Sequence, residues 1–176
     1  MKNEKFVCLL ILVFFFFFSS KSAFAESSYV LPYPSSMPGS FAYKFHLVYE
    51  NISKYWHFGS FGQFEYNLKI ADKYLVEAKT LFEYKQYLLA YKALKKSDFY
   101  FINILPQLIK ANKEEKDIIQ KRNILTYAVE KHIEVLEKIE GETPNAFVWR
   151  PEKALPTTLY LQKEIVNSVL LRKKSL

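Results

Sequence analysis

The chain has 176 residues, a formal net charge of +7 and one cysteine, Cys8. A single cysteine excludes an internal disulfide, a metal centre held by several cysteines and haem attachment through a cysteine pair. No basic cluster accompanies the moderate charge, so the composition gives no indication of nucleic-acid binding.

The chain begins with the features of a secretory signal peptide. A lysine-containing start precedes an unbroken apolar run over 6–18, and Ala23 and Ala25 form the A-x-A arrangement that signal peptidase accepts. We therefore expect residues 1–25 to be removed by cleavage after Ala25, and the protein to be exported across the cytoplasmic membrane. The alternative is an uncleaved anchor, but the 13 residues of the run are fewer than the about 20 that span a membrane.

Cleavage would remove Cys8 and lower the net charge to +5. The exported domain would then have no thiolate chemistry, and its core would depend on aromatic and aliphatic side chains. All 13 tyrosines and both tryptophans follow the predicted cleavage site. A charge of +5 permits weak contact with a membrane surface or with cell-wall polymer, without requiring either.

Residues 26–40 are predicted to form an extended arm, because prolines disfavour helix in the residue that precedes them. Ser40 is the expected N-cap of a first helix over 41–57. Five apolar side chains follow helical spacing within it and share one face. They are Phe41, Phe45, Val48, Ile52 and Tyr55.

The second helix, over 61–82, has the most regular pattern in the chain. Its apolar residues alternate at spacings of four and three, which is typical of a narrow helix-on-helix seam. They are Phe64, Leu68, Ala71, Leu75, Ala78 and Phe82. A third helix is predicted over 84–111, with Pro106 kinking or splitting it near 102–105. Ser97 and Asp98 are an alternative cap for its second segment.

A fourth helix is predicted over 114–140, opened by Glu114 and Glu115 at its positive dipole end and stopped by Gly141. The connection over 141–156 contains prolines, and we expect two of its aromatic side chains, Phe147 and Trp149, to be buried.

The last helix is predicted over 158–173, capped by Thr157 or Thr158. Leu161, Ile165 and Val169 are expected to pack on the other helices. In the alternative interpretation this helix lies on a membrane, with the basic end 172–174 toward lipid headgroups.

These patterns predict an all-α chain: a bundle of four to five helices with an extended, proline- and tyrosine-rich N-terminal arm. The expected organisation is a signal peptide, the arm, a helical bundle, and a connection with a C-terminal helix packed on the bundle. Their bounds are 1–25, 26–40, 41–141 and 142–176.

Two segments, YVLPYPSSMPGSFAYKF (29–45) and NLKIADKYLVEAKTL (67–81), resemble a family of exported and membrane-linked bacterial proteins called domain of unknown function 5667. The matching positions are Tyr29, Val30, Leu31, Pro32, Tyr33, Pro34, Pro38, Tyr43, Leu68, Ala71, Asp72, Leu75, Glu77, Ala78 and Leu81. The chain departs from the family pattern at Ser35, Met37, Phe41, His46 and Tyr74. The resemblance implies an exported α-helical domain with no assigned activity, and it leaves a sensing role open.

Asp72 is the motif carboxylate. We expect it to accept a hydrogen bond from Tyr43 or Lys44 and so to lock the first two helices together. The arm is the other candidate, since its prolines pre-order an extended strip and its tyrosines offer contact area. Either it binds another molecule or it packs on its own bundle, with Tyr29, Leu31 and Tyr33 inserted. Pro32 and Pro34 complete this strip.

The chain has three histidines that could take part in chemistry. His46 and Glu50 share a helix face and could contribute to a metal site, although a useful site would need His57 and His132 to converge on them from other segments. His132 is expected to face other helices, either as a satisfied core polar group or as a pH switch.

No GxSxG motif, glycine-rich phosphate loop or paired catalytic carboxylates are present. We therefore expect a non-enzymatic envelope protein without a cofactor, acting as a structural or protein-interaction module with an envelope protein partner. The sequence leaves the oligomeric state open. The alternative is an extracytoplasmic ligand or metal sensor.

Overall fold

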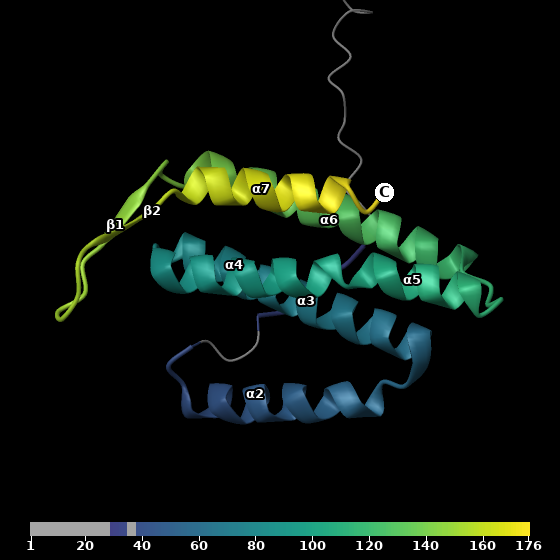
Figure 1. The fold of residues 1–176 in the computed structure, drawn as a ribbon. Coiled ribbons are helices and arrows are strands. Elements are labelled where there is room, and N and C mark those ends of the chain that lie inside the picture. Colours follow the sequence, from purple (N-terminus) through teal and green to yellow (C-terminus); the bar gives the residue numbers. More distant parts are fainter. Residues whose placement is uncertain (1–28, 35–37) are drawn as a thin grey trace, which may run out of the picture.

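The computed structural model describes residues 29–34 and 38–176. The predicted signal peptide and its cleavage site lie outside the described residues. The predicted all-α class is confirmed, and Figure 1 shows the arrangement. The elements are α2 (Phe41–Ser53), η1 (Lys54–Trp56), α3 (Gly59–Glu83), α4 (Tyr87–Ile102), α5 (Ile104–Lys113), α6 (Ile119–Glu142), β1 (Phe147–Trp149), β2 (Thr157–Leu159) and α7 (Leu161–Lys173).

Helix α3 is the centre of the fold, because α4, α5 and α6 all pack on it. The seam predicted from its spacing is confirmed: all six of its residues are buried, and Ala71, Leu75 and Ala78 are 0 % exposed. The break before α3 is also confirmed. A side chain at Gly62 would place its Cβ 2.8 Å from the carbonyl carbon of His57, so glycine permits the close turn from η1 into α3.

The predicted split of the third helix is confirmed, since α4 ends at Ile102 and α5 begins at Ile104. Pro106 lies in the first turn of α5, where a missing backbone N–H costs no intrahelical bond. The sequence suggests Ser97 and Asp98 as an alternative cap for the second segment, but they do not cap it. Both are buried in the middle of α4, where packing and polar contacts from other helices hold them.

The fourth helix begins at Ile119, five residues later than the sequence predicts. Glu114 is the C-cap of α5, and Glu115 has φ 57°, so the chain turns before α6 begins. The side chain of Asp117 then accepts a hydrogen bond from the backbone N–H of Ile119, at 3.0 Å. Gly141 does not stop the helix but lies within α6, one residue before its end.

The connection after α6 forms an antiparallel hairpin of β1 and β2, with Phe147 opposite Leu159. Thr157 and Thr158 therefore lie in β2 and do not cap α7. Phe147 is half-buried, with its ring 5.2 Å from that of Tyr87. Trp149 was expected to be buried, but it is 37 % exposed, because the hairpin extends away from the helices (Figure 1).

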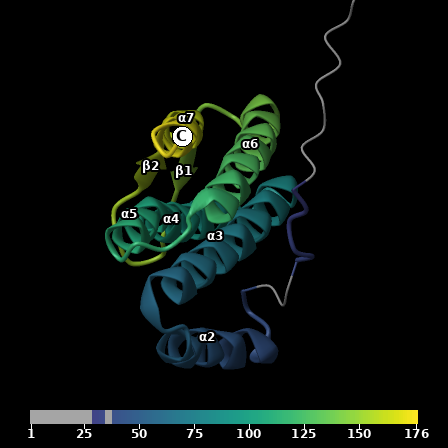
Figure 2. The same cartoon turned by 90° about the vertical axis from the view of Figure 1, so that its right-hand side faces the viewer.

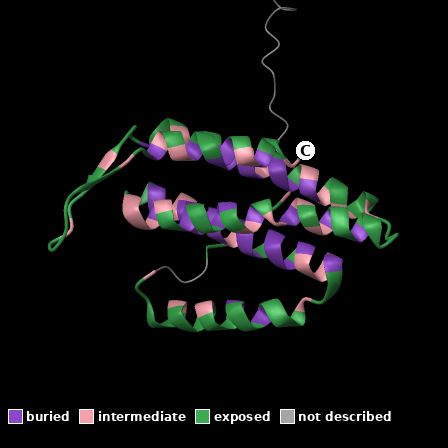
Figure 3. Cartoon of the chain, in the orientation of Figure 1, coloured by how far each residue is buried: buried purple, intermediate pink, exposed green. Residues whose placement is uncertain are grey.

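Helix α2 forms a separate layer at one side of the molecule, with α6 and α7 on the other side in both views (Figures 1 and 2). Most of α2 is exposed, whereas the helices above it bury a continuous interior (Figure 3). Among the described residues, no helix combines the length and apolar character needed to cross a membrane.

Candidate functional site

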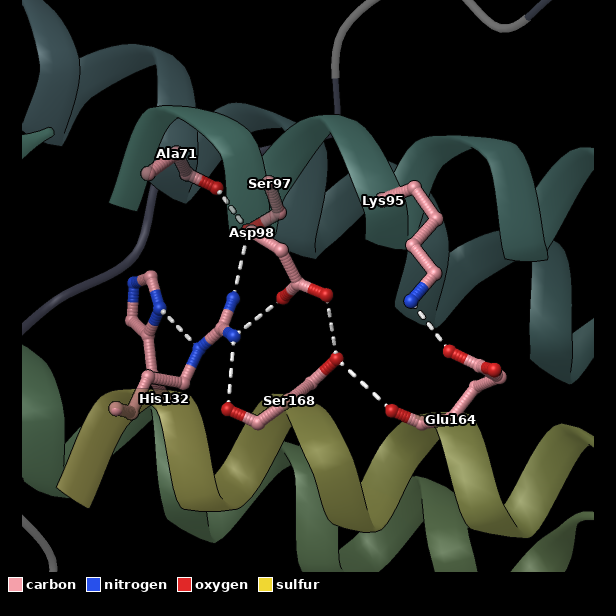
Figure 4. Close-up of polar contacts among 8 residues, drawn as sticks. Ala71, Lys95, Ser97, Asp98, His132, Glu164 and Ser168 are labelled. Atoms are coloured by element: carbon pink, nitrogen blue, oxygen red, sulfur yellow. Dashed lines mark hydrogen bonds and ion pairs between the residues drawn. The ribbon is translucent and has the colours of Figure 1, made fainter. Parts of the chain in front are cut away.

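A cluster of polar side chains lies at the centre of the four packed helices α3, α4, α6 and α7 (Figure 4). Arg172 of α7 is 0 % exposed and donates through its Nη1 to Asp98 Oδ1 at 2.5 Å and through its Nη2 to Ser97 Oγ at 2.9 Å. The Ser168 hydroxyl donates to the other oxygen of Asp98 at 2.7 Å. We call these residues, with His132 and Asp72, the polar centre.

His132 of α6 connects the carboxylate of Asp72 to the guanidinium of Arg172. Its Nε2 lies 2.7 Å from Asp72 Oδ1, and its Nδ1 accepts from Nε of Arg172 at 3.2 Å. An acceptor at Nδ1 requires the neutral tautomer with the proton on Nε2, which donates to Asp72. Burial, reinforced by the charge of Arg172, holds the pKa of His132 below its usual value. The histidine is therefore a neutral link between Asp72 and Arg172.

The polar centre also fastens the arm to α3. The Tyr29 hydroxyl donates to Asp72 Oδ2 at 2.6 Å, and burial together with the neighbouring carboxylate raises the pKa of this tyrosine. Ser97 donates in turn to the backbone carbonyl of Ala71 at 2.8 Å. Since His132 and Arg172 are both 0 % exposed, no substrate reaches them in this conformation. The hydrogen bonds of the polar centre join four helices and the arm to one another.

In the alternative interpretation of the last helix, Arg172 lies at a basic end directed toward lipid headgroups, but the structure buries its side chain among the helices. The spacing contains the information that was missed: Arg172 follows Leu161, Ile165 and Ser168 at intervals of four, three and four, on the buried face of α7. A buried arginine needs a carboxylate partner, and Asp98 supplies it from α4.

A second polar cluster, the α2 anchor, attaches α2 to α3. Glu50 is 8 % exposed and accepts from the Tyr74 hydroxyl at 2.8 Å, while its other oxygen pairs with Lys73. The Tyr43 hydroxyl donates to Glu77 Oε1 at 3.0 Å. Burial raises the pKa of Glu77, whose Oε2 is buried without a hydrogen-bond partner in the described structure.

With the α2 anchor facing inward, the apolar face predicted for this helix faces solvent. Phe41 is 78 % exposed, Phe45 is 63 % exposed and Trp56 is 64 % exposed. We define the outer face of α2 as the exposed large apolar side chains of this segment. They are Phe41, Phe45, Val48, Tyr49, Ile52, Tyr55, Trp56 and Phe58. Isolated exposed apolar residues are ordinary, whereas a group of this size along one helical segment is unusual on a folded domain.

A family profile described as "Domain of unknown function (DUF5667)" matches residues 35–146 of the chain. The chain belongs to this family. The match extends from α2 through α6, so the α2 anchor, Asp72 and His132 lie within it, whereas the first arm residues and α7 lie outside. No curated protein and no solved structure matches the chain.

The DUF5667 motif residues form two separate contacts, not the one expected. Asp72 accepts from Tyr29 and His132, while Tyr43 bonds Glu77. The expected bond from Tyr43 or Lys44 to Asp72 is therefore wrong, and Lys44 is exposed. The carboxylate locks the arm to α3, and Glu77, another motif position, receives α2.

The arm residues 29–34 lie along α3 and α6, and together they line a groove of about 650 Å³. Tyr29 and Leu31 are half-buried against the apolar interior, and Tyr33 is 96 % exposed. Pro32 and Pro34 line the same groove. Two of the three side chains expected to pack on the bundle therefore do so, and Tyr33 does not.

The suggested metal pair does not form a site in this family member. His46 is exposed, whereas the Glu50 carboxylate is bonded inward to Tyr74 and Lys73. Over residues 29–34 and 38–176, no group of three or more histidine, cysteine or acidic side chains is placed to hold a metal ion.

Proposed function

We propose that this DUF5667 protein is an exported, non-enzymatic interaction module of the cell envelope that works through the outer face of α2. The pattern of its first 25 residues supports export. Its packed helices serve as a rigid support, and its working part is a surface.

One observation carries this proposal: an aromatic stripe of the described structure faces solvent, on a segment whose opposite face is bonded to α3 through Tyr43 and Glu50. Phe45 of α2 and Trp56 of η1 are each more than 60 % exposed, although Glu50, between them in the sequence, is buried and bonded. Leaving such a stripe uncovered sacrifices hydrophobic stabilisation, so a partner that covers it gains that free energy on binding. By contrast, the buried carboxylates of Asp72, Asp98 and Glu50 are bonded to side chains of other helices. The buried His132 is bonded to Asp72.

Photocrosslinking in intact cells tests the proposal. A benzophenone amino acid placed at Phe45 should give crosslinked adducts in the envelope fraction. The same group at Ile109 of α5, which is 51 % exposed, serves as the control for a non-specific apolar position. Adducts at position 45 and few at position 109 support the proposal; equal yields at both positions contradict it.

A further inference from the structure

We infer that the outer face of α2 binds the surface of an anionic phospholipid bilayer, with α2 lying in the headgroup region parallel to the membrane plane. This inference rests on the proposed function and names the partner of the same face. Three features of the described residues support it: the kind of apolar side chain, the distribution of charge and the position of α2.

The apolar side chains are of the type that lies at a membrane interface. Tyr49, Tyr55 and Trp56 combine a large ring with a polar group, and they are between 56 % and 74 % exposed. Such side chains place the ring among acyl carbons and the polar atom among headgroups. Phe41 and Phe45 extend the stripe along the helix, with their rings 5.1 Å apart in an edge-on arrangement.

The charges of this segment suit an anionic surface. Glu50 is the only acidic residue over 41–58, and its carboxylate is bonded inward to Tyr74 and Lys73. Lys44 and Lys54 are exposed on the same helical segment. An aromatic stripe on a segment with two exposed lysines, and with its one carboxylate withdrawn, fits an interfacial helix that prefers anionic lipid.

The position of α2 suits a planar partner. Both views place α2 as the outermost element on its side of the molecule, with no described element beyond it (Figures 1 and 2). A flat surface can therefore contact the whole length of the helix. With 13 residues, α2 is too short to span a bilayer, which takes about 20, so it would lie on the membrane.

The two tryptophans allow a matched test, because Trp56 lies in the outer face and Trp149 lies in the hairpin. The variant Trp149→Phe leaves Trp56 as the only tryptophan, and Trp56→Phe leaves Trp149. Both are purified from exporting cells and mixed with phosphatidylglycerol–phosphatidylcholine vesicles. Because their N-terminal residues are identical, any contribution of those residues to binding is common to both.

The expected result is a blue shift of Trp56 emission on mixing, quenching by brominated lipid, and no comparable change for Trp149. Pure phosphatidylcholine vesicles should bind less, and added salt should weaken binding to the anionic vesicles. Solvent-exposed emission from Trp56 at saturating lipid would overturn the inference, whether or not the protein sediments with the vesicles.

A double substitution measures what the outer face contributes. Phe45→Ser with Trp56→Ser should weaken partitioning into anionic vesicles by at least ~10-fold, since two large apolar side chains lose their burial. The control is Ile109→Ser with Leu170→Ser, which removes two apolar residues that are each 51 % exposed on other helices. This control should bind as the unsubstituted protein does. Equal losses in both variants would contradict the inference.

Failure of the inference differs from failure of the proposed function. If vesicles are not bound but the crosslinker at Phe45 captures a protein or a second copy of this chain, the outer face is an interaction surface and the bilayer is the wrong partner. If the protein does not bind vesicles and the crosslinker at Phe45 gives no adducts, both proposals are wrong.

Discussion

The central helix α3 and the outer helix α2 both carry an apolar stripe at helical spacing, but one stripe is buried and the other faces solvent. Leu75 of α3 is 0 % exposed, whereas Phe45 of α2 is 63 % exposed. The difference lies in the polar residues of the opposite face. On α2, Tyr43 and Glu50 bond to α3, so the anchored face points inward and the apolar stripe points out. Periodicity thus shows which residues share a face, while polar partners decide where that face points.

The polar clusters of the two regions differ in how many helices they join. The polar centre ties four helices together around Arg172, which is 0 % exposed. The α2 anchor ties one helix to α3 through Glu50 and Lys73, whose side chains are 10 % and 15 % exposed. Removing a partner from the polar centre should therefore affect the whole domain, and removing one from the anchor should affect α2 alone.

The largest effect is expected for Arg172→Ala. This substitution leaves Asp98 buried without its cation, which costs about 3–5 kcal/mol in such settings. Urea denaturation should show a correspondingly lower free energy of unfolding, or no folded protein. Lys173→Ala, on the exposed neighbour, is the control and should change stability by less than about 0.5 kcal/mol. A mild Arg172→Ala variant would remove the distinction between the two clusters.

The next effect is a pH dependence that belongs to the polar centre. The pKa of His132 is lowered in the folded protein, so below about pH 6.5 the unfolded chain takes up a proton that the folded one does not. Stability is therefore complete above that pH and should fall by up to about 1.4 kcal/mol for each pH unit below it.

The variant His132→Gln should be less stable than the unsubstituted protein at neutral pH, but this part of the pH dependence should be absent from it. Chemical denaturation between pH 7 and pH 5 measures both quantities. The titration of Glu77, whose pKa is raised, acts in the opposite direction as pH falls and is common to both proteins. Parallel pH curves for the two proteins would show that His132 is not kept neutral by the fold.

A local effect is expected for Glu50→Ala. Losing the bonds to Tyr74 and Lys73 should favour detachment of α2 by about 1–3 kcal/mol. Hydrogen exchange should accelerate over 41–53, while α3 and α6 keep their protection. Glu65→Ala removes an exposed carboxylate that pairs with Lys121 and is the matched control. Faster exchange throughout the molecule would mean that α2 belongs to the same cooperative unit as the core.

The seams of α3 and α7 and the split at Pro106 could be predicted from the sequence, because each depends on local spacing or on a proline. The partners of buried polar groups could not. The sequence offers several possible hydrogen-bond donors for Asp72, and only the tertiary arrangement shows that Tyr29 and His132 are its partners. The orientation of α2 depends on the hydrogen bond between Glu50 and Tyr74, which lies 24 residues later. The spacing of residues within α2 cannot predict that contact.

The smallest effect distinguishes the two apolar stripes directly. Phe45→Ser removes a side chain that water already contacts, so the free energy of unfolding should change by no more than about 0.5 kcal/mol. Leu75→Ala, in the seam of α3, should cost about 2–5 kcal/mol because it opens a cavity in the core. Denaturation of both variants in the same buffer gives the comparison. A large loss for Phe45→Ser would show that the stripe is covered within the folded protein, and α2 would then have no free outer face to offer a partner.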